Sequence, residues 1–138
     1  MDTTAVIDYI RDNCGINTIV FSDLDFTSSN LGLNTITVAV TDVNNNQSAE
    51  LTDIWVIDRL GPNMKAKNVI LPLGNTGLAV IDVTDIDNNS SDNIGLDSLY
   101  ISTSSFSCVD LGDHWVILTG LDASGNSDTA WSKVTVVD

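Results

Sequence analysis

The chain repeats itself at a spacing of 80 residues, and this limits its possible folds more than any other feature. When the sequence is shifted by 80 positions, it aligns with itself without a gap over all 58 residues that overlap. The coinciding positions include Asp12-Asn13 with Asp92-Asn93, Leu31-Gly32 with Leu111-Gly112, and Asp42 with Asp122. Chance seldom keeps register over such a length, so tandem modules are expected. We predict an N-terminally truncated repeat over residues 1–58 and a complete repeat over residues 59–138.

The local pattern predicts β-strands throughout. Residues 34–42 alternate with period two, with Ile36, Val38 and Val40 on one face and threonines on the other. β-Branched residues dominate the apolar runs, and clusters of Gly, Asn, Asp and Ser separate them. Strands are expected near 67–73, 77–85, 96–102, 113–122 and 128–138, and the end of a strand near 2–6. No helix is predicted. The fold class is therefore all-β, with tandem antiparallel immunoglobulin-like β-sandwich modules joined at Pro62.

Charge excludes some classes of partner. Five Lys and Arg residues stand against 19 Asp and Glu residues, which gives a formal net charge of −14. Such a surface repels nucleic-acid phosphates and anionic lipid. It is compatible with divalent cations, or with solubility alone in a secreted protein. No apolar run approaches the roughly 18 residues that a transmembrane helix needs, so no membrane insertion is expected.

Two acidic loops form the candidate metal site. They are "DIDNNSSDN" at 85–93 and "DASGN" at 122–126. In an immunoglobulin-like sandwich, both loops lie at the end that receives the linker from the preceding module. The expected ligands are Asp58, Asp85, Asp87 and Asp122. Their mutual repulsion would be relieved by Ca²⁺, which takes six to eight oxygen ligands in flexible geometry. In the alternative interpretation, Asp and Asn only cap turns, and this is favoured for Asp42 and Asp122.

The remaining residues with chemical potential give weaker signals. Cys14 and Cys108 occupy different positions of the repeat, so we expect two free, largely buried thiols. His114 has no nearby partners suited to zinc or to nucleophilic catalysis, and no catalytic residue is assigned. Trp131 is expected in a core. Trp55 and Trp115 are expected to be exposed, as weak candidates for stacking on a sugar.

The order of short motifs resembles a known repeat. The second copy contains Asp92-Asn93-Ile94-Gly95, then Phe106-Ser107-Cys108, then the turn at 122–126 and a final Val137-Asp138. The first copy contains Asp12-Asn13-Cys14-Gly15 and the turn at 42–46. This order is similar to repeats of large Bacteroidetes cell-surface adhesins, including those of gliding motility. Those repeats carry a cysteine pair, of which each copy here keeps one half.

The resemblance implies a non-enzymatic, extracellular module at the cell surface. It would act as a stalk, spacer or adhesive unit, with surface polysaccharide or another cell-surface ligand and neighbouring repeats of its own chain as partners. Calcium at the module junction would stiffen it. The alternative is a carbohydrate-binding module of a secreted multidomain protein.

Overall fold

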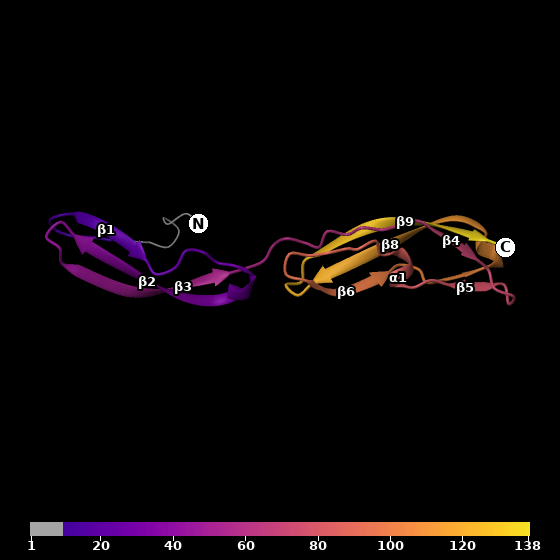
Figure 1. The fold of residues 1–138 in the computed structure, drawn as a ribbon, viewed down its shortest axis with the longest axis horizontal. Coiled ribbons are helices and arrows are strands. Elements are labelled where there is room, and N and C mark those ends of the chain that lie inside the picture. Colours follow the sequence, from indigo (N-terminus) through magenta and orange to yellow (C-terminus); the bar gives the residue numbers. More distant parts are fainter. Residues whose placement is uncertain (1–9) are drawn as a thin grey trace. The chain divides into compact units, whose positions relative to one another are not determined.

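The chain divides into two compact units, Met1–Asp58 and Arg59–Asp138, called unit 1 and unit 2 below. The computed structural model describes residues 10–138. The strand end expected near 2–6 lies outside the described residues. Each unit is described by itself, and Figure 1 labels most of the strands of both.

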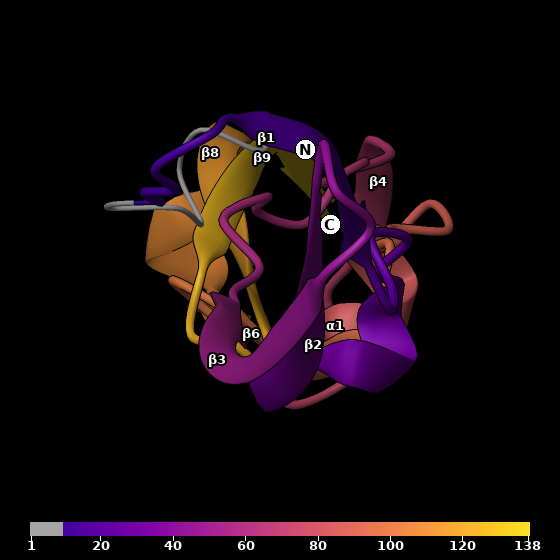
Figure 2. The same cartoon turned by 90° about the vertical axis from the view of Figure 1, so that its left-hand side faces the viewer.

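Unit 1 contains a three-stranded antiparallel sheet in the order β1-β2-β3. The strands are β1 (Ile16–Phe21), β2 (Gly32–Asp42) and β3 (Gln47–Val56), and a 3₁₀ turn, η2 (Ser28–Asn30), precedes β2. The twist of the long β2–β3 hairpin is visible in Figure 2. Ile36 and Ile54 are its buried apolar side chains among the described residues.

Unit 2 contains a four-stranded sheet in the order β4-β9-β8-β6 and a separate pair, β5·β7. Its elements are β4 (Val69–Pro72), β5 (Leu78–Val80), α1 (Val83–Ile86), β6 (Leu96–Ile101), β7 (Ser105–Ser107), η3 (Cys108–Asp110), β8 (Gly112–Asp122) and β9 (Ser127–Val137). The β6·β8, β8·β9 and β5·β7 pairs are antiparallel, whereas β4 runs parallel to β9.

The core of unit 2 is formed by one face of the large sheet and by the segments that cover it. Val116 and Leu118 of β8 and Val134 and Val136 of β9 are buried, because alternate residues of a strand point to the same face. The buried cluster is completed by Met64, Ile81, Ile86 and Phe106. These residues come from outside the β8–β9 hairpin, so the hairpin has a covered face.

The two units repeat the same local structure at 80-residue spacing. β1 and β6, η2 and η3, and β2 and β8 begin and end at equivalent positions, and β3 and β9 begin at equivalent positions. The register irregularity between Ile16 and Thr18 recurs between Leu96 and Ser98. Gly15 and Gly95 both have φ of 116°, a conformation that L side chains rarely adopt. The repeated sequence therefore specifies repeated backbone geometry.

The structure confirms the all-β class, and it corrects several local predictions. The strand expected over 77–85 ends at Val80, and residues 83–86 form the helical turn α1. The Asp82 side chain accepts hydrogen bonds from the N–H groups of Thr84 and Asp85, and Asp85 bonds back to the Asp82 N–H. This reciprocal capping favours a helix start over a continued strand.

Exposure also differs from prediction for three side chains. Trp131 is 59% exposed and not in the core, because buried Ser132 and Val134 place it on the outer face of β9. Cys14 and Cys108 are free, as expected, but both are exposed. Their 3₁₀ and loop positions leave them outside the apolar faces of the sheets.

Candidate functional site

The acidic turns recurring at 80-residue spacing have one structure. In unit 1, Asp42 Oδ1 accepts hydrogen bonds from the N–H groups of Asn44 and Asn46, both at 2.8 Å, and Oδ2 accepts one from Asn46 Nδ2 at 2.7 Å. The side-chain bond from Asn46 is the main cause that lowers the pKa of Asp42. Asn45 has a φ of 68°. The carboxylate thus closes the β2–β3 turn.

Asp122 repeats this arrangement in unit 2. It accepts hydrogen bonds from Ser124 N at 2.9 Å, from Asn126 N at 2.8 Å and from Asn126 Nδ2 at 2.8 Å. Gly125, with a φ of 84°, takes the position of Asn45. The turn-capping role that we favoured for Asp42 and Asp122 is therefore present in both hairpins.

A second pair of aspartates closes the loops that lead into β1 and β6. Asp12 Oδ1 accepts from the N–H groups of Cys14 and Gly15 at 2.8 and 2.9 Å. Asp92 Oδ1 accepts from Ile94 and Gly95 at 3.0 and 3.2 Å. The Asp-x-x-Gly spacing is thus an Asx-type turn that ends in a glycine of positive φ.

The predicted metal ligands do not form one group. Asp58, half-buried, is the last residue of unit 1. In unit 2, Asp122 comes together with Asp92, and each offers a carboxylate oxygen within 4.8 Å of the other. Asp85 and Asp87 lie outside that group: Asp85 Oδ2 accepts from Asp82 N at 2.8 Å, and Asp87 Oδ1 accepts from Ser90 N at 3.0 Å. Like charges so close repel each other, and a divalent cation would offset that repulsion.

The sequence prediction missed Asp92, although a signal for it was present. Asp92 begins the repeated Asp-Asn-x-Gly motif. The antiparallel register of β6 and β8, which pairs Leu96 with Asp122, brings the loop of Asp92 toward the 122–126 turn.

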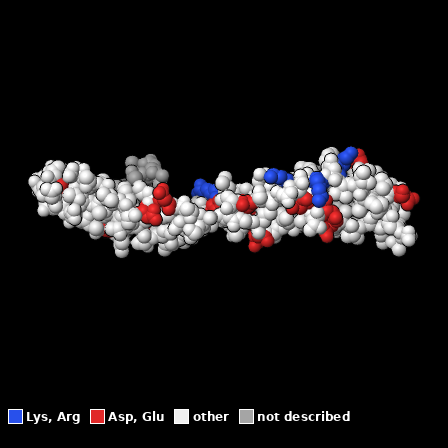
Figure 3. Space-filling model, viewed as in Figure 1, with Lys and Arg blue, Asp and Glu red and all other residues white. Residues whose placement is uncertain are grey.

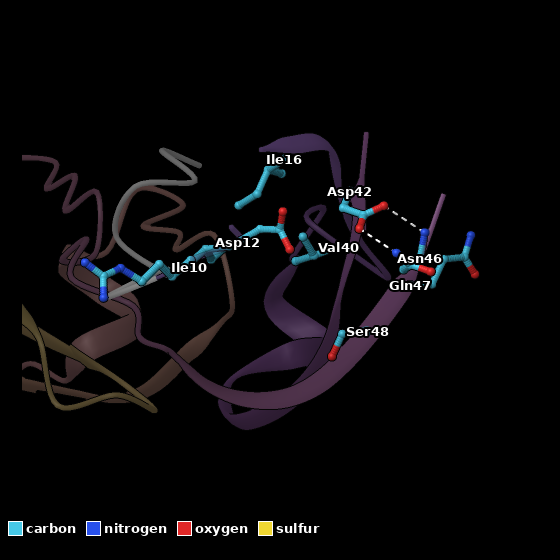
Figure 4. Close-up of a pocket in the computed structure, with 9 residues that line it drawn as sticks. Ile10, Asp12, Ile16, Val40, Asp42, Asn46, Gln47 and Ser48 are labelled. Carbon is cyan, nitrogen blue, oxygen red and sulfur yellow. Dashed lines mark hydrogen bonds between the residues drawn. The ribbon is translucent and has the colours of Figure 1, made fainter. Parts of the chain in front are cut away.

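Unit 1 has the same pairing, Ile16 with Asp42. There, a shallow pocket is lined by Ile10, Arg11, Asp12, Ile16, Val40, Asp42, Asn46, Gln47 and Ser48. Figure 4 shows Asp12 and Asp42 in this lining, with the bonds between Asp42 and Asn46 dashed.

The aromatic candidates lie on sheet surfaces. Trp115 of β8 is 63% exposed and Trp55 of β3 is 70% exposed. In unit 2, Trp115 pairs with Lys133, and Trp131 pairs with Ile117, which is two residues beyond Trp115. Trp115 and Trp131 are therefore diagonal neighbours on the face of the sheet opposite the core. The exposure expected for Trp55 and Trp115 is confirmed, and Trp55 lies on a strand of unit 1.

Tyr100 adds a third aromatic side chain to the outer face of unit 2. It is half exposed and pairs with Thr119 of β8, which alternates with the buried residues Leu118 and Gly120. Lys133 forms a salt bridge of 3.2 Å with Asp113, and Thr135 donates to Asp113 at 2.6 Å. The outer face thus combines flat aromatic groups with hydrogen-bonding groups.

The histidine and cysteines make local contacts. The Nε2 of His114 lies 2.7 Å from the carbonyl oxygen of Asp110, and its ring centroid is 5.6 Å from that of Phe106. Cys108 Sγ lies 3.6 Å from the carbonyl oxygen of Gly77. These contacts tie η3 and the start of β8 to neighbouring segments, and they account for the half-buried position of His114.

Figure 3 shows small separate patches of acidic groups on the face drawn, with basic groups among them. Within residues 10–138, no helix combines the length and apolar character needed to cross a bilayer.

No protein-family model matches this chain, and no curated protein matches it in sequence. Its function has to be inferred from the fold and the surface groups described above.

Proposed function

We propose that this chain is a non-enzymatic repeat module of an extracellular cell-surface adhesin, built from immunoglobulin-like units and acting as a spacer or stalk. The repetition of strands, bulge and turns at 80-residue spacing supports a tandem array. The two packed layers of unit 2, a four-stranded sheet and the β5·β7 pair, support an immunoglobulin-like interpretation.

The observation that carries the spacer proposal is the parallel pairing of β4 with β9. β4 is the first strand of unit 2 and β9 is the last, and Val69 to Pro72 pair in register with Val134 to Val137. When the two ends of the unit are pulled apart, adjacent parallel strands slide past each other. Their evenly spaced hydrogen bonds are then loaded together rather than one after another. Such a pair resists force along the chain, which is what a spacer between a cell and a surface requires.

Single-molecule force spectroscopy tests this function. The intact chain, held at both ends, is expected to give a high-force unfolding event for unit 2. Replacing Leu73 with Pro should lower that force because it removes the N–H that donates to the Val137 carbonyl at 2.8 Å. Leu73→Ala is the matched control: it keeps this N–H and should lower the force less. Low-force unfolding of the intact unit 2, with no difference between the variants, would contradict a role in transmitting force.

A carbohydrate-binding module is the second candidate, and the placement of Trp131 favours it. Trp131 joins Trp115 and Tyr100 on one exposed sheet face. Flat aromatic rings with nearby hydroxyl and charged groups suit stacking against the apolar faces of sugar rings. The acidic chain favours a neutral polysaccharide over an acidic one.

Glycan-array binding separates the two candidates. Saturable binding that is lost in Trp115→Ala and in Trp131→Ala, but kept in Trp55→Ala, would support a sugar-binding face on unit 2. Loss in Trp55→Ala alone would place the binding in unit 1. Absence of binding to any neutral glycan, together with a high unfolding force, would leave the spacer role.

Calcium binding remains a prediction within this proposal. A divalent ion held by the carboxylates that include Asp92 and Asp122 would fix the loop before β6 against the β8–β9 turn. Such an ion would stiffen that end of unit 2 and so would suit a module that transmits force.

A further inference from the structure

We propose that the outer edge of β3 in unit 1 is a docking edge for a parallel β-strand of the kind that β4 provides in unit 2. β3 and β9 are equivalent strands of the repeat, and they differ in what lies beside them. β9 lies between β8 and β4, whereas β3 ends the β1-β2-β3 sheet. The basis of the proposal is this internal repeat, independent of any assignment as an adhesin.

Unit 2 shows how the docked strand is held. Backbone pairing runs from Val69 with Val134 to Pro72 with Val137, and Leu73 N donates to the Val137 carbonyl at 2.8 Å. Side chains add two bonds at the start of the strand. Ser132 Oγ donates to the Lys67 carbonyl at 2.8 Å, and Lys133 N donates to Asn68 Oδ1 at 2.9 Å. Val69, Leu71 and Leu73 pack against the core cluster.

Unit 1 retains the receiving half of this arrangement. Thr52 takes the position of Ser132 and keeps a hydroxyl that can donate to an incoming carbonyl. Ile54 and Val56 take the positions of Val134 and Val136. Trp55 and Ile57, beside them, are 70% and 57% exposed. Within residues 10–138 no strand pairs with the outer edge of β3, and an apolar edge of this kind favours strand addition.

Charge indicates which strand fits this edge. β3 carries Glu50 and Asp53 and no basic residue. The segment 63–74, which includes β4, carries Lys65 and Lys67 and no acidic residue. A strand of this type is attracted to β3, whereas β3 of a second copy would bring carboxylates against carboxylates. The occupant is therefore an apolar strand preceded by basic residues, and the expected register places Val69 beside Ile54 and Leu71 beside Val56.

A peptide of residues 63–74, capped at both ends, tests the proposal on the full chain. Calorimetry is expected to show saturable binding with one peptide per chain. Amide NMR signals of residues 52–57 should shift, and a spin label at the peptide N-terminus should broaden Thr52 more than Ile57, because the strands run parallel. A peptide with Val69→Asp and Leu71→Asp is the matched control and should not bind, since it would place charges in an apolar layer.

Two protein variants sharpen the test. Asp53→Lys should weaken peptide binding most at low salt, where charge interactions are least screened. Thr18→Lys, an exposed position on β1 at the opposite edge of the same sheet, leaves the charge of the docking edge unchanged and should bind normally. Circular dichroism checks that both variants fold.

Several outcomes would overturn the proposal. They are absence of binding, equal binding of the control peptide, broadening strongest at Ile57, or shifts confined to β9, which would mean exchange with the β4 of unit 2. Concentration-dependent dimerisation that Asp53→Lys strengthens, without peptide binding, would assign the edge to a second copy instead.

Discussion

Aspartate side chains in this chain act first as caps for turns. Asp12, Asp42, Asp92 and Asp122 each accept hydrogen bonds from two backbone N–H groups further along the chain. Asp82 does the same at the start of α1. These bonds close turns and begin a helix, so much of the acidic content of the sequence has a structural use.

Acid is expected to destabilise the fold for this reason. The side-chain hydrogen bond from Asn46 is the main cause that lowers the pKa of Asp42, and bonds from Thr84 and Ser107 lower the pKa values of Asp82 and Asp110. A carboxyl whose pKa is lower in the folded state stabilises the fold fully above its ordinary value of 3.8. That stability is lost as the pH falls through the lowered folded-state pKa. Thermal unfolding followed by circular dichroism should therefore show a falling Tm below about pH 4.

The control for this prediction is Asp42→Asn, which keeps an acceptor oxygen but does not titrate. It should reduce the acid sensitivity of unit 1 and leave that of unit 2 unchanged. A Tm that is constant from pH 5 to pH 2.5, at about equal ionic strength, would contradict the prediction.

Calcium is expected to raise the Tm through Asp92. An ion that binds only the folded state stabilises it in proportion to the logarithm of its concentration. Asp92→Asn keeps the loop hydrogen bonds but removes one charge of the carboxylate cluster, so it should abolish the increase. Asp85→Asn with Asp87→Asn should not, because those carboxylates lie outside the cluster. Loss of the calcium effect in the double variant alone would instead support the ligands expected from the sequence.

At the scale of elements, the β2–β3 and β8–β9 hairpins have equivalent register but different surroundings. The inward residues Val116 and Leu118 are 1% and 0% exposed. Their counterparts are Ile36, which is 3% exposed, and Val38, which is half-buried. The difference arises because Ile81, Ile86 and Phe106 cover the inner face of the second hairpin. The same strand pattern thus contributes unequal stability in the two units.

Truncation of equivalent side chains should reveal this difference. Leu118→Ala is expected to cost about 2–5 kcal/mol of unfolding free energy, as for a fully buried leucine. Val38→Ala should cost less, because part of that side chain already contacts water. Urea unfolding, with NMR signals assigned to each unit, measures both. Equal losses would show that burial does not distinguish the two hairpins.

At the scale of the whole molecule, two units of unequal core size are expected to open at different free energies. The buried apolar cluster of unit 2 has eight members, whereas Ile36 and Ile54 are the buried apolar residues of unit 1 within residues 10–58. Amide hydrogen exchange should therefore be slower in β8 and β9 than in β2 and β3. The peptide of residues 63–74 should slow exchange in β3 only. Equal protection of the amides of both units from exchange, measured without the peptide, would contradict the prediction that the two cores open at different free energies.

Much of the fold can be predicted from neighbours in the sequence. The alternation of Ile36, Val38 and Val40 indicated β2, and the expected strands over 96–102 and 113–122 correspond to β6 and β8 within one residue at each end. Turn capping at Asp42 and Asp122 was also predicted. The hydrogen bonds of these turns span only two to four residues, so they depend on the residues of the turn itself. The same sequence motif therefore forms the same turn in each copy of the repeat.

Contacts between distant segments were decided only by the tertiary structure. Burial of Ser132 placed Trp131 outside, capping by Asp82 ended β5 early, and the loop that contains Asp92 came close to Asp122. The parallel pairing of β4 with β9 joins residues 65 positions apart. Such contacts depend on which apolar faces meet when the chain closes. The sequence by itself determined the strands and turns. Packing decided which face of the β8–β9 hairpin is covered and that the outer edge of β3 is left without a neighbouring strand in residues 10–138.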